Sequence, residues 1–181
     1  MKLQGPLLSA WQTSDGAQGV GDASLLDRPL TAFFASRQCS GVAIRAAMEW
    51  AVTQARGRTP VISGFHSSLE QSVLKVMLTA GGPCVMVIAR PIEQARLPAS
   101  WLRAVQEGTA AVISMESASN RLTAECAARR NDWVAGHADR IVVAYASPEG
   151  NLMPQIAQWE HSDKPVTYLV RPRSGDVPSG S

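Results

Sequence analysis

The chain has 181 residues, the length of one ordinary domain, of which 45% are hydrophobic and 18% charged. This composition supplies a core, so it excludes overall disorder and a fibrous repeat as descriptions of the chain. The 17 Lys and Arg residues against 15 Asp and Glu residues give a net charge of +2, which excludes a strongly basic nucleic-acid coat but allows a local basic patch.

In chain order, residues 1–29 are expected to form an N-terminal extension that is mostly loop. Between residues 10 and 29, three glycines and a proline stand among scattered polar residues without a regular period. Residues 30–170 are expected to form the folded domain. The tail, residues 171–181, mixes Pro, Gly and Ser and is expected to be flexible.

Strand and helix patterns alternate through the expected domain. The strand-like apolar runs are 30–35, 60–63, 84–90, 110–114, 141–146 and 166–170. The helical patterns are 40–56, 67–80, 99–107, 123–138 and 154–161. Short strands linked by helices require crossover connections and therefore parallel pairing. The sequence thus predicts an α/β fold, a Rossmann-like, doubly wound, mostly parallel sheet flanked by helices.

The helical patterns also predict which side chains pack inward. Ile44 and Met48 share one face of the first helix with two alanines, and we expect that face to be buried. Met77 and Val134 occupy apolar positions of later helices and are expected to face the sheet.

Targeting signals are missing from the sequence. The longest uninterrupted apolar run, residues 84–89, is far shorter than the roughly 20 residues of a membrane-spanning helix, and the N-terminus has no stretch that suits a signal peptide. Three cysteines, an odd number without CxxC spacing, indicate a reducing compartment and argue against a zinc site. We therefore expect a cytoplasmic protein with no membrane partner, no metal and no cofactor.

Ligands of open parallel sheets bind beyond the carboxyl ends of the strands, where helix N-termini present free N–H groups. The first such loop, SRQCSG, contains Ser36, Arg37 and Gly41, whose backbone and charge suit an anion. The alternative is an ordinary turn in which Ser40 caps the helix. A nucleophilic Cys39 would need a base that nothing local marks.

The next loop, GFHSSLE, places His66 immediately before an expected helix. A histidine there can hydrogen-bond a phosphate or carry a proton, or it only helps to set the turn. Ser67 and Glu70 have the spacing of a capping box, so Glu70 is interpreted as a cap partner rather than a catalytic acid. Further along, residues 127–139 carry a basic stretch around Arg130 that is either a solvated face or an edge aimed at phosphates.

Several of these motifs together resemble the DprA/Smf DNA-processing family. RNDWVAGHADRIVVA at 130–144 looks like that family's RNRIIAGLSD segment with its following strand. ASR at 35–37 with Gly41 resembles its GSR loop, and VISGFHSSLE at 61–70 resembles its VSGLARGID loop. EGNL at 149–152 stands in the place of its SGSL turn. The resemblance covers about residues 30–170.

The resemblance implies a Rossmann-like core that binds single-stranded DNA at a basic pocket and works with the RecA recombinase. Arg37 and Arg130 match positions that contact phosphate, and Asn131 matches the asparagine of the family motif. The turn glycines of the family are matched by Gly41, Gly64 and Gly150.

Departures from the family pattern bear on this expectation. The second arginine of the RNR motif is Asp132, which would repel a nearby phosphate or pair with Arg130. The phosphoribohydrolase signature PGGxGTxxE of the related LOG enzymes is missing. The sequence therefore favours ligand binding over LOG-type hydrolysis.

We interpret the chain as a non-enzymatic module that binds a nucleotide or single-stranded DNA in DNA processing or recombination, with Phe65 and Trp133 as candidate stacking partners for bases. The alternatives are a LOG-type nucleotide-cleaving enzyme that uses His66 or Glu149, and a sensor of nucleotide derivatives. Further expected partners are a RecA-type recombinase and a second copy of the chain. The expected ligand-binding residues are Ser36, Arg37, Gly41, Gly64, His66, Arg130, Asn131 and Gly150.

Overall fold

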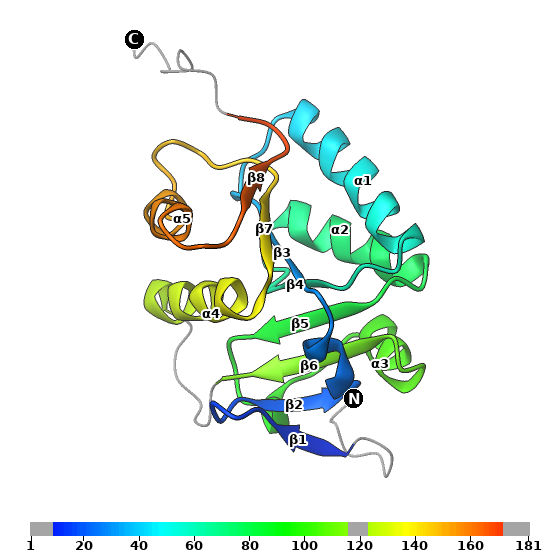
Figure 1. Ribbon diagram of the computed structural model, residues 1–181. Helices are drawn as coiled ribbons and strands as arrows, with labels where there is room; N and C mark the ends of the chain where they lie inside the picture. The colour runs from blue at the N-terminus through cyan, green and yellow to red at the C-terminus, as the bar shows by residue number, and fades with distance from the viewer. Residues whose placement is uncertain (1–8, 116–122, 172–181) are drawn as a thin grey trace.

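The computed structural model describes residues 9–115 and 123–171, which form an eight-stranded sheet with helices on both faces (Figure 1). The strands are β1 (Ala10–Gln12), β2 (Gln18–Gly21), β3 (Thr31–Phe34), β4 (Val61–Ser63), β5 (Cys84–Ile88), β6 (Ala110–Ser114), β7 (Arg140–Val143) and β8 (Val166–Tyr168). The helices are α1 (Gly41–Arg56), α2 (Ser68–Thr79), α3 (Ala99–Gln106), α4 (Ala124–His137) and α5 (Met153–Glu160), with 3-10 helices η1 (Ala23–Asp27) and η2 (Ile92–Gln94).

The strand order is β1-β2-β6-β5-β4-β3-β7-β8. All pairings from β6 through to β8 are parallel. The parallel part of the sheet starts at β3, continues outward through β4 and β5 to β6, and then returns to the opposite side of β3 for β7 and β8. The predicted Rossmann-like, doubly wound fold is confirmed. Its topological switch point, where ligands of this architecture bind, lies between β3 and β7.

Two apolar cores lie on the two faces of the sheet. Helices α1, α2 and α3 cover one face, and α4, α5 and η1 cover the other (Figure 1). Met77 on α2 and Val134 on α4 are fully buried against the sheet, as predicted. Strand β5 is buried along nearly its whole length, which explains its continuous apolar sequence. None of the described helices combines the length and apolarity needed to cross a membrane.

For the described residues 9–29, the expectation of mostly loop is wrong. Strands β1 and β2 form an antiparallel pair, and β2 pairs antiparallel with β6, so these residues extend the sheet. The sequence of β2 is QGVG, with Val20 as its one large apolar side chain, so no strand pattern is visible. The strand β6 provides the hydrogen-bonding partner of β2. Gly21, at φ +93°, approaches the Ala110 carbonyl so closely that a side chain would clash there.

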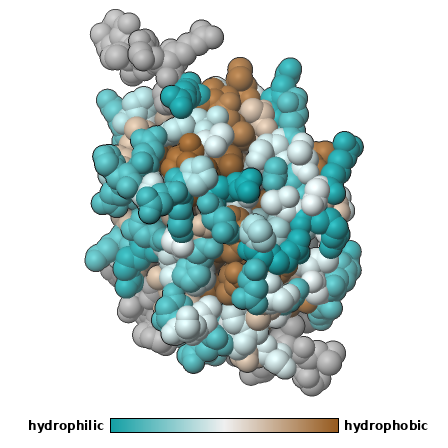
Figure 2. Space-filling view, viewed as in Figure 1, coloured by the Kyte–Doolittle hydropathy of each residue, from teal (hydrophilic) through white to brown (hydrophobic). Residues whose placement is uncertain are grey.

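The predicted inner face of α1 is also partly wrong. Ile44 is 45% exposed, and the buried row consists of Ala43, Ala47, Ala51 and Ala55. Small alanines at intervals of four allow α1 to lie close against the neighbouring layer, and the larger residues turn outward. Figure 2 shows hydrophobic surface at the top of this view, over the region where α1 begins.

Candidate functional site

The loops after β3, β4 and β7 meet at the carboxyl edge of the sheet. Ser36, directly after β3, accepts a hydrogen bond at Oγ from the backbone N–H of Ser147, at 2.8 Å, across the switch point. Its own N–H donates to the Tyr145 carbonyl at 3.0 Å. Ser36 therefore fixes the two loops to each other, which is a positioning role that its place in the SRQCSG motif did not reveal.

A cavity of about 470 Å³ opens between these loops and helices α4 and α5. It brings together most of the predicted ligand-binding residues, namely Ser36, Arg37, His66, Arg130, Asn131 and Gly150. Gly64 lies beside it beneath the Arg130 side chain. Gly41 does not line it, because this residue begins α1 and its Cα faces open space.

Glu70 organises the loop after β4. Its carboxylate accepts hydrogen bonds from the backbone N–H groups of Ala35 at 3.0 Å, His66 at 2.8 Å and Ser67 at 3.0 Å. The bonds to Ser67 complete the capping box that the sequence predicts. The bond to Ala35 adds a link between β3 and α2. Because this buried carboxylate is held by three donors, it serves structure rather than acid–base chemistry.

Arg130 carries a buried and incompletely paired charge. The residue is 9% exposed, and its Nε has no hydrogen-bond partner within the described chain. Its Nη2 donates to Asn131 Oδ1 at 3.2 Å. Burial lowers the pKa of the Arg130 guanidinium, and the charge of Glu70 opposes that shift. A buried N–H group without an acceptor costs free energy, which an anion in the cavity would recover.

Asp132 is directed away from Arg130, so the expected repulsion or local pair is wrong. Its Oδ1 accepts hydrogen bonds from Gln155 Nε2 at 2.9 Å and from Trp159 Nε1 at 3.2 Å. Gln155 also accepts from Asn131 Nδ2 at 3.1 Å. This network of α4 and α5 side chains positions Asn131 and directs Asp132 away from Arg130. Gln155 is a buried residue that the sequence analysis missed, because no local pattern marks it.

Gln155→Leu is expected to lower the free energy of unfolding by about 1–3 kcal/mol, because Asn131 and Asp132 would each lose a partner. Chemical denaturation of the variant and wild type measures this loss. Gln158→Leu, at an exposed position of the same helix, is the matched control and is expected to change stability little. Equal stability of the Gln155 variant and wild type would contradict the network.

Cys39 does not have the properties of a nucleophile. Burial raises the pKa of its thiol, and the nearby Glu70 charge raises it further. The Sγ atom donates to the Ser36 carbonyl at 3.2 Å. Within the described residues, no cluster of three or more His, Cys, Asp or Glu side chains is placed to hold a metal ion.

The Cys39 thiol is therefore expected to react with iodoacetamide more slowly than a cysteine in an unstructured peptide at the same pH, because alkylation requires the thiolate. Site-resolved mass spectrometry of the native protein measures the rate, and the urea-unfolded protein is the control. A native rate equal to or above the peptide rate would contradict the raised pKa.

The two predicted stacking residues have different positions. Phe65 lines the carboxyl edge but is 3% exposed, with a left-handed backbone at φ +45° that is uncommon for a bulky residue. Trp133 lies away from the cavities. Its ring stacks on that of His137, with 3.7 Å between the ring centroids, and its Nε1 donates a hydrogen bond to Asp15 Oδ2 at 2.8 Å. Trp133 is thus not placed to stack on a ligand here.

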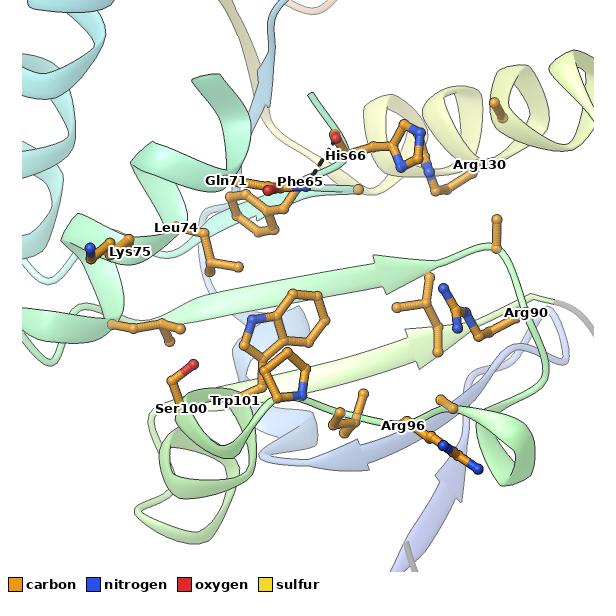
Figure 3. Close-up of a pocket in the computed structure, with 18 of the residues that line it drawn as sticks. Phe65, His66, Gln71, Leu74, Lys75, Arg90, Arg96, Ser100, Trp101 and Arg130 are labelled. Carbon is orange, nitrogen blue, oxygen red and sulfur yellow. Dashed lines mark hydrogen bonds between the residues drawn. The ribbon is translucent and has the colours of Figure 1, made fainter. Parts of the chain in front are cut away.

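A second, larger cavity of about 830 Å³ adjoins the first and shares Arg37, His66 and Arg130 with it. Figure 3 shows its side chains converging from α2, α3, α4 and the end of β5. Among the residues of this cavity that the sequence did not single out are Lys75, Arg90, Arg96 and Trp101. The position of Arg90 directly after β5 is a signal that could have found it, because ligands bind beyond that end of a parallel strand.

A model of the DNA recombination-mediator protein A family matches residues 18–173. The chain belongs to this family. The DNA recombination-mediator match begins in β2, so it includes the strand that the sequence analysis had assigned to loop. A comparison with curated proteins found no match.

Several solved structures have a fold similar to that of this chain. DNA processing protein A of Streptococcus pneumoniae superposes with a TM-score of 0.71 at 16% identity, covering 90% of this chain and 63% of that protein. The Helicobacter pylori protein, described for its mode of binding single-stranded DNA, gives 0.72 at 16% identity, covering 93% and 82%. A molybdenum cofactor carrier protein from Chlamydomonas reinhardtii gives 0.53 at 14% identity, covering 78% and 75%. At these identities the likeness concerns the fold.

Proposed function

We propose that this DNA recombination-mediator protein A family member binds single-stranded DNA, without catalysis, through phosphates held at the carboxyl edge of its sheet. The observation that carries the proposal is Arg130, a buried guanidinium whose Nε lacks a partner within the described chain and which lines the cavity at the switch point. The family match and the single-stranded DNA binding described for the H. pylori protein support the same function.

The chemistry of the cavity suits a phosphate. Arg37 is exposed at its rim and forms no ion pair with an acid among the described residues, while Arg130 supplies a second guanidinium from α4. Charge-assisted hydrogen bonds from arginine to phosphate are among the strongest that proteins form. Asn131 and Gly150 also line the wall. The lining includes two carboxylates as well, Glu70, which three backbone N–H groups hold, and Glu149, which is exposed.

The further parts of the proposal concern partners and place. A RecA-type recombinase and a second copy of the chain are proposed as partners on the strength of the family. A cytoplasmic location is proposed because the described chain contains three free cysteines, as a reducing compartment favours.

Thermal shift measurements with oligothymidylate, double-stranded DNA of equal length and single nucleotides test the function. The proposal expects the single strand to raise the melting temperature most, with an effect that falls as salt rises. Release of a cleaved base or sugar from any nucleotide would contradict a purely binding role, and equal melting temperatures with and without every ligand would contradict binding.

A further inference from the structure

The larger cavity has a charged rim and an apolar floor. Its rim carries Arg37, Lys75, Arg90, Arg96 and Arg130, and the described lining contains no Asp or Glu. For a chain whose net charge is only +2, a cavity with five cationic residues and no acid is a concentrated positive field. Apart from Arg130, none of these side chains has a hydrogen bond or ion pair within the described residues. The cationic side chains of the rim are therefore available to bind anions.

The floor of this cavity is made of flat and branched apolar side chains. Phe65 and Leu74 lie on one side, and Trp101 extends from α3 toward them (Figure 3). Trp101 is only partly buried, and its indole N–H has no acceptor in the described part of the chain. By contrast, the indoles of Trp11, Trp133 and Trp159 all donate hydrogen bonds. Trp101 therefore has both a ring face and a donor available to a ligand.

The two cavities adjoin each other. Both are lined by Arg37, His66 and Arg130, so a ligand that reaches Arg130 from one side meets the Trp101 floor on the other. Each volume, about 470 and 830 Å³, lies within the range of roughly 300–1,000 Å³ that single small ligands occupy. A ligand that fills both must be longer than one such unit and must alternate anionic and flat apolar parts.

We propose that the Trp101 cavity is a second nucleotide subsite, in which a base stacks on Trp101 while Lys75 and Arg96 contact the backbone phosphates. This inference rests on the proposed function and deepens it. The smaller cavity holds one phosphate, and the Trp101 subsite takes the neighbouring nucleotide of the same strand. The protein thereby distinguishes an oligonucleotide from a mononucleotide, because only the longer ligand reaches both subsites.

Trp101→Leu tests the subsite, because leucine keeps apolar volume on α3 but removes the aromatic face. The binding of thymidine monophosphate and of short oligothymidylates of increasing length is measured by calorimetry. The expected result is an oligonucleotide affinity lower by about 5- to 150-fold, the range of one lost base stack, with mononucleotide affinity unchanged. Trp101→Phe, which retains an aromatic face, is expected to recover part of the loss. Trp133→Leu is the matched control outside both cavities.

A second variant removes a charge at an exposed position, so that a loss of binding is not caused by misfolding. Lys75→Gln, at an exposed position of α2, is expected to weaken oligonucleotide binding and reduce its salt dependence, while Arg45→Gln on α1 is not. Undiminished oligonucleotide affinity in both Trp101→Leu and Lys75→Gln, with wild type binding normally, would overturn the subsite and leave the proposed function standing. An equal loss for mononucleotide and oligonucleotide would also overturn it. Wild type that binds no oligonucleotide would overturn the function and the subsite together.

Discussion

Gly64→Ala is expected to weaken single-stranded DNA binding by about 10- to 150-fold, the loss expected when one charge-assisted contact of roughly 1.5–3 kcal/mol is removed. A Cβ atom on Gly64 would lie 2.4 Å from Arg130 Nε and 2.6 Å from Arg130 Cζ. The guanidinium must therefore move out of its place over the β4 loop. Gly64 does not have a left-handed backbone, so alanine adds no backbone strain there, and the contact with Arg130 is the only expected conflict.

A double-mutant cycle identifies the cause of this loss. If Gly64→Ala acts by displacing Arg130, it should add little to the loss that Arg130→Ala already causes. Gly136→Ala on the same helix as Arg130 is the control, because a Cβ there meets nothing within 4 Å. Calorimetric titration with one oligonucleotide measures wild type, the two single variants, the double variant and the control. Additive losses in the double variant would mean that Gly64 contributes by some other route.

Glu70→Leu is expected to lower the free energy of unfolding by roughly 3 kcal/mol or more, because it leaves three backbone N–H groups without their acceptor. The groups belong to Ala35, His66 and Ser67, so the ends of β3 and β4 would lose their common anchor. Arg130 would also lose the one acidic charge that favours its ionised form.

Urea denaturation of wild type and the variants measures the effect. Glu70→Gln retains the shape and one acceptor oxygen, and is expected to be intermediate between wild type and Glu70→Leu. Glu49→Gln, on the exposed side of α1, is the matched control and should remain close to wild type. Stability of Glu70→Leu within about 0.5 kcal/mol of wild type would contradict the anchoring role.

The fold was predictable where local patterns carry it. Continuous apolar strands such as β5, and the Ser67–Glu70 capping box, depend on residues close in sequence, and both predictions were confirmed. The β1–β2 pair could not be predicted, because its partner is the edge of β6, some ninety residues away along the chain. The exposed Ile44 was missed for a related reason, since the close approach of α1 selects alanines rather than large side chains.

Several residues of the site could be predicted from the sequence, but the hydrogen bonds between them could not. The family motifs led to Arg37 and Arg130, which do line one cavity. No sequence pattern could indicate that Asp132 turns toward α5, because that depends on Gln155 reaching across from another helix. Trp101 was likewise hidden, since a tryptophan in a helix is more often a core residue than a cavity wall.

The salt dependence of oligonucleotide binding tests the central claim most directly. Wild type, Arg37→Ala and Arg130→Ala are titrated with one single-stranded oligonucleotide over a series of salt concentrations. If both arginines neutralise phosphates, each variant should bind more weakly and reduce the slope of log K against log salt by about 0.7. Two variants that bind as tightly as wild type, with an unchanged slope, would contradict a phosphate site at this edge of the sheet.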